Sequence, residues 1–113
     1  MKIEFIQEAF IEYKSLDGSL KTLVDKLLIK LEKNPFLGEE LGNKNNIDLT
    51  GYYKIYFDKK RYRIVYRVLK NEIEIIEIWG IGKRDKMEIY KAVDKRINDR
   101  MYKYSNSLTD TPE

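Results

Sequence analysis

Cysteine and histidine are both absent from the 113-residue sequence, and their absence excludes several kinds of site. Without cysteine, the chain has no disulfide, no thiol nucleophile and no thiolate metal ligand. Without histidine, a Ser-His-Asp triad is impossible, and zinc is not expected because its ligands are mainly Cys and His. We therefore expect no metal and no other cofactor. Acid–base chemistry near neutral pH would have to use Tyr, Lys, Arg, Asp or Glu with shifted pKa values.

Long apolar runs are lacking too. No stretch approaches the roughly 18 apolar residues of a membrane-spanning helix, so we expect no membrane partner. The segment MKIEFIQEAF at the start has acidic side chains and no apolar run of signal-peptide length, which makes the cytoplasm the expected location. With 42% hydrophobic and 36% charged residues, the composition is typical of one soluble globular domain. We assign residues 1–103 to this domain and expect residues 104–113 to form a flexible C-terminal tail.

Basic charge is concentrated in the second half of the chain. Residues 1–48 carry 7 Lys, no Arg and 9 acidic residues, whereas residues 49–103 carry 15 basic and 8 acidic residues. The net charge of +3 for the whole chain hides this asymmetry. The bias favours a polyanionic partner for the second half, and a solvated basic surface explains the same charge equally well.

The first third of the chain predicts a short strand followed by two helices. Residues 2–6 fit the strand, and residues 7–16 fit a short helix that Asp17-Gly18 ends. Apolar residues then recur at helical spacing, at Leu20, Leu23, Val24, Leu27, Leu28 and Leu31. Asn34-Pro35 ends this second helix of a helical hairpin, and residues 35–51, which hold three glycines, are expected to form a loop.

From residue 52 the apolar period changes to two, which predicts strands. Residues 52–58 and 61–69 form a hairpin whose turn is Lys59-Lys60. The large apolar side chains of both strands share one face. Lys54 and Arg63 therefore lie together on the opposite, open face.

A third strand is expected at residues 72–79, with Gly80 and Gly82 ending it. Its alternation of apolar and polar residues slips at Ile75-Ile76. This slip predicts either a β-bulge at that point or burial of both faces of the strand.

A last helix is expected after Asp85. The run Asp85-Lys86-Met87-Glu88 fits a capping box, with an acidic N-cap and a glutamate three residues on. The apolar stripe of the helix comprises Ile89, Val93, Ile97 and Met101. The predicted fold is α+β, with an N-terminal helical hairpin packed on a small antiparallel sheet of three or four strands and a C-terminal helix.

Side chains from four separate segments are candidates for one cationic site. Lys54 and Arg63 share the open face of the hairpin. Arg84 follows the third strand, and Tyr90 lies one turn into the last helix. The residues that would extend this surface toward RNA are Arg61, Lys83, Arg67 and Tyr56. Each candidate also has a structural explanation, because strand arginines often pair with acidic neighbours and a helix tyrosine often packs on a sheet.

These residue types suit cleavage of RNA without a metal. The reaction deprotonates a ribose 2′-hydroxyl, stabilises a pentacoordinate phosphorane and protonates the 5′-oxygen that leaves. Arg and Lys stabilise the charge of the phosphorane. A tyrosine among cations is a reasonable base because positive charge favours its phenolate, whereas Arg donates a proton only weakly. This interpretation requires an accessible Tyr90 phenol that faces Arg63 and Arg84.

Three motifs of the second half carry a family resemblance. They are Leu49-x-Gly51-x-Tyr53-Lys54, then Tyr62-Arg63-Ile64-Val65-Tyr66, and then Gly82-Lys83-Arg84 with Tyr90 six residues later. Together, and with the helical hairpin before them, they resemble the RelE/ParE superfamily of bacterial toxins, most closely its RelE branch. The resemblance extends over roughly residues 2–98.

The resemblance implies the toxin of a type II toxin–antitoxin system, which enters the ribosomal A site and cleaves mRNA there by metal-independent 2′-hydroxyl attack. It implies that Tyr90 is the general base. It also implies that Lys54, Arg63 and Arg84 bind the phosphate and stabilise its charge. The implied partners are a cognate antitoxin protein, mRNA and the ribosome, with DNA contacted only through the antitoxin complex.

Two features depart from the family pattern. Related toxins often have a second lysine two residues after the first, and this chain has Tyr56 there, so the proton donor for the leaving group is open. The chain also extends beyond the usual last helix, from about Asp99 to Glu113. Two alternatives therefore remain: a ParE-like inhibitor of DNA gyrase, and a catalytically degenerate member that only binds nucleic acid or protein.

Overall fold

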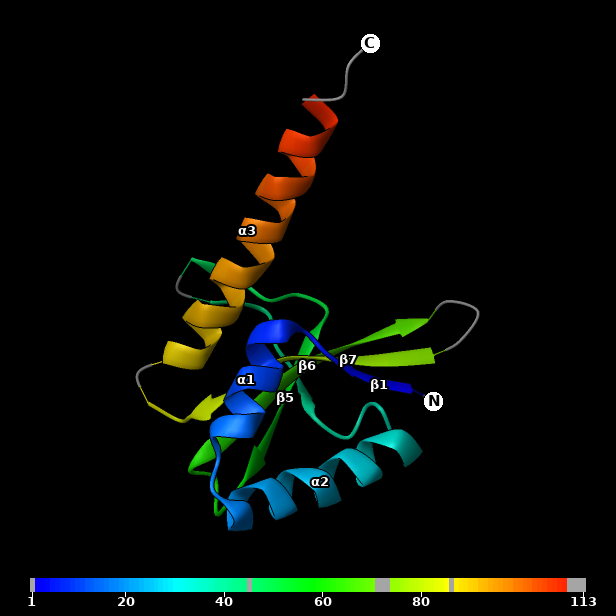
Figure 1. Cartoon of the computed structure of the whole chain (residues 1–113), viewed down its shortest axis with the longest axis vertical. Coiled ribbons are helices and arrows are strands. Elements are labelled where there is room, and N and C mark those ends of the chain that lie inside the picture. Colours follow the sequence, from blue (N-terminus) through cyan, green and yellow to red (C-terminus); the bar gives the residue numbers. More distant parts are fainter. Residues whose placement is uncertain (1, 45, 71–73, 86, 110–113) are drawn as a thin grey trace.

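The computed structural model describes residues 2–44, 46–70, 74–85 and 87–109, which form helices packed on a mixed sheet (Figure 1). The helices are α1 (Gln7–Ser15), α2 (Gly18–Lys33) and α3 (Glu88–Thr109). The longer strands are β1 (Lys2–Phe5), β5 (Tyr52–Phe57), β6 (Tyr62–Lys70) and β7 (Glu74–Lys83). Two-residue strands β2 (Glu39–Glu40), β3 (Asn43–Lys44) and β4 (Ile47–Asp48) interrupt the segment predicted as a loop. No helix in the described segments is long and apolar enough to cross a membrane.

The two predicted N-terminal helices are confirmed, and the break between them has a local cause. Asp17 is the N-cap of α2, and its side chain accepts a hydrogen bond of 2.9 Å from the Leu20 backbone N–H. A capping carboxylate satisfies one of the free N–H groups of the first helical turn. The chain therefore ends one helix and starts the next within three residues.

The main sheet has five strands in the order β1-β7-β6-β5-β2. β1 runs parallel to β7, and the other neighbouring pairs are antiparallel. The predicted antiparallel sheet of three or four strands is therefore wrong in its strand number and in the direction of β1. Apolar periodicity identifies a strand and its faces but not its neighbour, and β1 pairs with a strand from the far end of the chain.

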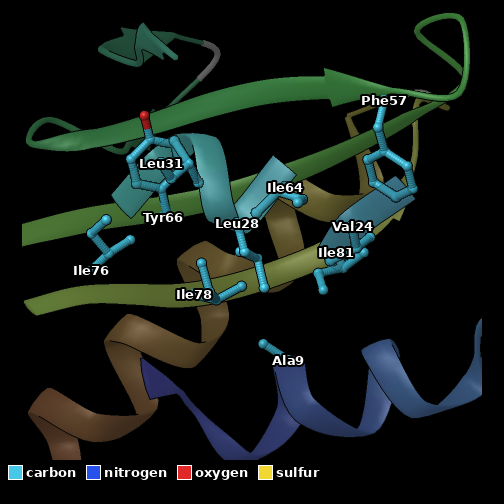
Figure 2. Close-up of a cluster of buried hydrophobic side chains, with 10 residues drawn as sticks. All are labelled: Ala9, Val24, Leu28, Leu31, Phe57, Ile64, Tyr66, Ile76, Ile78 and Ile81. Carbon is cyan, nitrogen blue, oxygen red and sulfur yellow. The ribbon is translucent and has the colours of Figure 1, made fainter. Parts of the chain in front are cut away.

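Each face of the sheet has its own apolar core. α1 and α2 cover one face, and Figure 2 shows the cluster of buried side chains between these helices and the strands. α3 and the β3–β4 pair cover the opposite face, where Leu49, Trp79 and Val93 belong to a second cluster. The predicted faces of the β5–β6 hairpin are confirmed, because Ile55 and Ile64 belong to the first cluster and Val65 to the second.

β7 does not end at Gly80 and Gly82, as predicted, but continues to Lys83. A Cβ atom at Gly80 would lie 2.7 Å from a Val93 methyl carbon and 2.9 Å from Ile89 Cδ1. At Gly82 it would lie 3.1 Å from the same Ile89 atom. The two glycines therefore lie inside the strand because α3 packs directly against the backbone of β7.

A β-bulge lies at Trp79 and not at Ile75-Ile76. The pairing of β7 with β6 shifts between Ile78 and Gly80, which leaves Trp79 as the additional residue. Ile78 belongs to the core under α1 and α2, whereas Trp79 belongs to the core under α3. The bulge shifts the alternation of faces by one residue, so Trp79 and Gly80 both face α3, whereas Ile78 before them and Ile81 after them face α1 and α2.

The start of α3 differs from the prediction. The helix begins at Glu88, so Asp85 is not its N-cap. Instead, the backbone carbonyl of Asp85 accepts the Glu88 N–H at 2.9 Å, and Met87 between them has a positive φ of 62°. Lys86, the second residue of the predicted capping box, lies outside the described residues.

The far end of α3 projects beyond the sheet (Figure 1). Met101, predicted to belong to the apolar stripe, is 63% exposed. The helix continues through Thr109, so residues 104–109 of the predicted tail are helical. The boundary of the domain at residue 103 stays a prediction.

Two arginines of α3 join this helix to α1. The Arg96 guanidinium donates to both carboxylate oxygens of Glu12 at 2.9 Å and to the Trp79 carbonyl at 2.9 Å. Glu12 also accepts the backbone N–H of Ile81 at 3.1 Å. One turn further on, Arg100 donates to Glu8 at 2.8 and 3.2 Å. Carboxylates on α1 therefore fix both the strand bulge and the helix that crosses it.

Replacement of Glu12 by alanine should destabilise the protein strongly. The side chains of Glu12 and Arg96 are only 26% and 15% exposed, so the variant leaves a guanidinium and an N–H without their acceptor. We expect a loss of about 3 kcal/mol in the free energy of unfolding, measured by urea denaturation. Asp99→Ala, which removes an exposed pair with Lys95, is the control and should cost less than about 1 kcal/mol. Equal losses in the two variants would contradict this role of Glu12.

The pair of Glu8 with Arg100 should make stability sensitive to acid. The hydrogen bond from Arg100 lowers the pKa of Glu8 from 4.5 to about 2. A carboxyl with a lowered folded-state pKa contributes stability above its unfolded value of 4.5, and this contribution is lost as the pH falls toward 2. Denaturant unfolding across this window should show a smaller decline in Glu8→Gln than in the wild type. Glu32→Gln, exposed on α2, serves as the control, and identical declines in all three proteins would refute the linkage.

Candidate active site

The β5–β6 hairpin brings three predicted site residues, Lys54, Tyr56 and Arg63, to one end of the sheet, on the face that α3 covers. Tyr56 of β5 pairs directly with Arg63 of β6, and Lys54 lies two residues before Tyr56 on the same face. Arg84 follows the last residue of β7, and its backbone N–H donates to the Arg61 carbonyl at 2.8 Å. α3 begins just beyond Arg84. This end of the sheet therefore lies next to the β7–α3 connection and the first turn of α3.

Tyr56 lies at the centre of this cluster. Its hydroxyl accepts a hydrogen bond of 3.0 Å from Lys54 Nζ. Its ring centroid lies 5.4 Å from the Arg63 guanidinium carbon, 5.5 Å from that of Arg84 and 5.9 Å from Lys60 Nζ. Four cations from three segments thus surround one phenol, and we call Tyr56, Lys54, Arg63 and Arg84 the cationic cluster.

The electrostatics of the cationic cluster favour the phenolate of Tyr56. The hydrogen bond from Lys54 lowers the pKa of Tyr56, and the charges of Lys54, Arg63 and Arg84 lower it further against the opposing effect of burial. The same hydrogen bond raises the pKa of Lys54, which keeps its ammonium protonated. Among the described tyrosines whose pKa is shifted, Tyr56 is the one for which the shift is downward.

Arg63 is the buried member of the cluster. It is 8% exposed, and its Nε and Nη1 atoms have no hydrogen-bond partner among the described residues. Its guanidinium carbon lies 4.6 Å from the Tyr90 ring centroid and 5.4 Å from that of Tyr56. A buried donor without an acceptor is costly, and the two rings offset part of this cost through cation–π contacts.

Tyr90 does not have the environment expected for a base. Its ring packs under Arg63, as a site member should, but the residue is 7% exposed and its hydroxyl is buried. Burial raises the pKa of the Tyr90 phenol, and the charges of Arg63 and Lys54, with Lys54 also acting as a weak hydrogen-bond donor, only partly offset this effect. The expectation of an accessible Tyr90 phenol with a stabilised phenolate is therefore wrong. The lowered pKa that was expected for Tyr90 is found at Tyr56 instead.

Three of the residues predicted to bind RNA lie apart from the cationic cluster. Arg67 forms an ion pair of 2.6 Å with Glu77, and its guanidinium carbon lies 5.1 Å from the Trp79 ring centroid. Arg61 pairs with Asp58 at 2.7 Å, and it lines a recess beside α2 together with Lys83. Contact of Arg61, Lys83 and Arg67 with RNA stays a prediction, whereas Tyr56, the fourth of the set, is central.

Two residues near the cationic cluster were not identified from the sequence. Lys60 was assigned only to a turn, yet the left-handed backbone of Asp58, Lys59 and Lys60 brings its ammonium over the Tyr56 ring. Glu39 of β2 pairs with Lys54 in the sheet, and its carboxylate lies 3.7 Å from Lys54 Nζ. The hairpin register indicates that Lys60 lies near Tyr56. Nothing in the sequence of the loop indicates that Glu39 lies near Lys54. Within the described ranges, no group of three or more acidic side chains is arranged to hold a metal ion.

As the pH rises, Tyr56 should ionise before those described tyrosines whose pKa is raised. An ultraviolet difference titration of the wild type should show one early tyrosinate transition, which Tyr56→Phe removes. Lys54→Met should move this transition to higher pH, because it removes the hydrogen bond that stabilises the phenolate. Tyr53→Phe, which lies on the opposite face of β5, is the control. Persistence of the early transition in Tyr56→Phe would show that another tyrosine is responsible.

Comparison with known proteins identifies the family. A family model described as the ParE toxin of the type II toxin–antitoxin system, parDE, matches residues 7–88. The mRNA interferase toxin RelE of Escherichia coli K12 is 27% identical over 95 residues, which are 84% of this chain and 95% of that protein. The crystal structure of the isolated E. coli RelE toxin is similar, with a TM-score of 0.62 and 24% identity over 85% of this chain and 97% of that one.

The E. coli RelBE toxin–antitoxin complex also contains a similar chain, with a TM-score of 0.60, 22% identity and coverage of 75% of this chain and 98% of that one. These structural similarities confirm the predicted α+β fold of the RelE type. Because the family model spans well over half of the sequence, the conclusion extends beyond fold. This chain belongs to the RelE/ParE superfamily and is a toxin of the type II toxin–antitoxin class.

Proposed function

We propose that this toxin is a ribosome-dependent endoribonuclease that cleaves mRNA in the A site by attack of a ribose 2′-hydroxyl on the adjacent phosphate. The observation that carries the proposal is the convergence of three cations on the Tyr56 phenol, which accepts a hydrogen bond from Lys54 and lies near the guanidinium groups of Arg63 and Arg84. A phosphodiester carries the negative charge and the acceptor oxygens that such a group of cations binds. The 27% identity to the mRNA interferase RelE supports the same reaction.

The phosphate is bound by three cations of the cationic cluster. Arg63 is buried beside the Tyr56 ring, Arg84 is exposed at the surface, and Lys54 donates to the Tyr56 hydroxyl. Their charge stabilises the phosphorane more than the singly charged phosphodiester, because negative charge accumulates as the 2′-oxygen attacks. Loss of one such preorganised donor typically costs on the order of 10²–10³ in rate.

Tyr56 acts as the general base and Lys54 as the general acid. The Tyr56 phenolate takes the proton of the 2′-hydroxyl, a bond forms between the 2′-oxygen and phosphorus, and the bond from phosphorus to the 5′-oxygen breaks. Lys54 donates its proton to the departing 5′-oxygen, which leaves a 2′,3′-cyclic phosphate and a 5′-hydroxyl. Because Tyr56 and Lys54 are joined by a hydrogen bond of 3.0 Å, the proton gained by the phenol returns to the amine and restores both groups.

Tyr90 is a positioning residue in this proposal. Its ring lies 4.6 Å from the Arg63 guanidinium carbon, and its buried hydroxyl has no acceptor in the described part of the chain. The ring, rather than the hydroxyl, therefore holds the guanidinium in place through a cation–π contact. This role differs from the general base that the family resemblance implies.

A cognate antitoxin is the proposed protein partner. The relatives of similar fold include the E. coli RelBE toxin–antitoxin complex. We propose a corresponding antitoxin for this toxin and action on ribosomes in the cytoplasm. DNA would be contacted only through the toxin–antitoxin complex.

A second candidate function is inhibition of DNA gyrase, which the match to a ParE toxin family model favours. Gyrase inhibition gives no reason for an unpaired guanidinium next to a phenol of lowered pKa. A degenerate binding protein of the same fold gives none either. The nuclease is therefore the function that the cationic cluster supports best.

Mapping of mRNA 5′-ends in a translating extract tests the nuclease. The wild type should cut within A-site codons, and Tyr56→Phe and Arg84→Ala should each cut at least about 100-fold more slowly. Tyr90→Phe, which keeps the ring, should stay within about tenfold of the wild type, whereas Tyr90→Ala should lose at least about 100-fold. Tyr56→Lys should retain cleavage, because the surrounding cations lower the pKa of the new amine and make it a base.

Lys95→Ala, exposed on α3, is the control for these variants. Near-normal cleavage by both Tyr56→Phe and Arg84→Ala would refute the assigned site. Absence of A-site cuts by the wild type, together with DNA breaks that depend on gyrase, would establish the second candidate instead.

A further inference from the structure

The turn between β5 and β6 has a backbone conformation that lysine does not favour. Asp58, Lys59 and Lys60 have φ values of 52°, 54° and 67°, so three consecutive residues without a glycine lie in the left-handed region. Asp tolerates this region because its short side chain can hydrogen-bond locally, whereas a lysine has no such compensation. Strained backbone of this kind is concentrated at binding and active sites, where the fold fixes a side chain in one place.

Lys60 is the residue that this turn brings to the cationic cluster. Its Nζ lies 5.9 Å from the Tyr56 ring centroid, slightly further than the 5.4 Å of the Arg63 guanidinium carbon. A hydrogen bond of 3.0 Å from the Arg61 backbone N–H to the Asp58 carbonyl closes the turn around Lys60. The end of the hairpin thus supplies a further cation to the ring of the proposed base.

The charge of Lys60 is not neutralised within the described part of the chain. Asp58 is the acidic residue of the turn, and its carboxylate pairs with Arg61 at 2.7 Å. Lys54, the other lysine at the ring, lies 3.7 Å from a Glu39 carboxylate oxygen. The exposed side chain of Lys60 has no hydrogen-bond or ion-pair partner among the described residues. Its ammonium is therefore available to an anion from outside the chain.

We infer that Lys60 is a substrate-binding residue whose ammonium binds the RNA phosphate next to the scissile one. This role rests on the proposed function, because it concerns the same RNA. Arg63 and Arg84 lie nearer the Tyr56 ring, where the 2′-hydroxyl loses its proton, so they bind the scissile phosphate. Lys60 lies further out, where the backbone continues into the neighbouring nucleotide. A lysine on a flexible stem binds such a phosphate as a point charge, without the fixed geometry of a guanidinium.

The first test measures how salt affects RNA binding by the isolated toxin. A single-stranded 2′-O-methyl RNA has no attacking hydroxyl, so it can bind without being cleaved. Each phosphate contact of a single strand contributes about 0.7 to the slope of log K against log salt concentration. Lys60→Gln should therefore reduce this slope by about 0.7 and weaken binding about tenfold at low salt. Lys59→Gln, which removes the same charge from the adjacent exposed position, is the matched control and should keep the wild-type slope.

The second test identifies the phosphate. An mRNA carries one methylphosphonate, an uncharged linkage, on either side of the A-site linkage that is cut. At one of these positions, the modification should raise the toxin concentration for half-maximal cleavage about tenfold more in the wild type than in Lys60→Gln. The cleavage rate at saturating toxin should differ little between the two proteins, because a contact with a phosphate that does not react contributes equally before and during the reaction.

Glycine variants separate the ammonium from the turn that carries it. Lys60→Gly and Lys59→Gly each place the residue that favours left-handed backbone in the turn, so each should unfold at a temperature no lower than the wild type. Only Lys60→Gly should show weaker RNA binding and the smaller salt slope. An equal loss of binding in Lys59→Gly would assign the effect to the shape of the turn and overturn the role of the Lys60 ammonium.

The outcomes separate this role from the proposed function. If the wild type makes no A-site cuts, the proposed function fails, and the salt slopes still decide whether Lys60 binds an RNA phosphate. If the wild type cuts but Lys60→Gln keeps its salt slope, or if the methylphosphonates affect both proteins equally, the role of Lys60 is overturned. Failure of the wild type to bind the 2′-O-methyl RNA at low salt would overturn it as well.

Discussion

The contact on which the site depends is the stacking of one buried guanidinium between two phenol rings. Arg63 is placed on a central strand, where a charge with no acidic partner is expensive to hold. The aromatic faces of Tyr56 and Tyr90 offset part of this cost without satisfying its hydrogen-bond donors. The resulting site is stable enough to fold and still incomplete. Arg63 therefore contributes a fixed positive charge beside the Tyr56 phenol.

Tyr56 and Tyr90 show how burial and charge shift the pKa values of two chemically identical phenols in opposite directions. Tyr56 is half-buried and accepts a hydrogen bond from an ammonium, so its pKa falls. Tyr90 lies deeper, beneath the guanidinium, and desolvation raises its pKa although the same cations are near. Proximity to positive charge is therefore not enough to make a base. The phenol must also stay near the solvent, because the desolvation of Tyr90 outweighs the same nearby cations.

Much of the site was predictable from residue order, and the remainder depended on packing. The alternation in the β5–β6 hairpin was enough to put Lys54 and Arg63 on one face, and the short turn fixed the register that pairs Arg63 with Tyr56. The burial of Tyr90 was not predictable from the sequence, because it depends on how closely α3 approaches β7. The parallel pairing of β1 and the bulge at Trp79 were missed for the same reason: periodicity describes one segment, whereas both features arise between distant segments.

The packing of α3 against β7 depends on Gly80 and Gly82. Neither residue has a side chain that could touch RNA, yet both are crowded by Ile89, the neighbour of Tyr90 in α3. A methyl group at Gly80 would force the side chains of Val93 and Ile89 in α3 to move. Positions that bear no functional group therefore set how closely α3, which carries Tyr90, approaches β7. A survey of inactivating substitutions would find these two glycines beside the charged residues, and a search guided only by reactive side chains would overlook them.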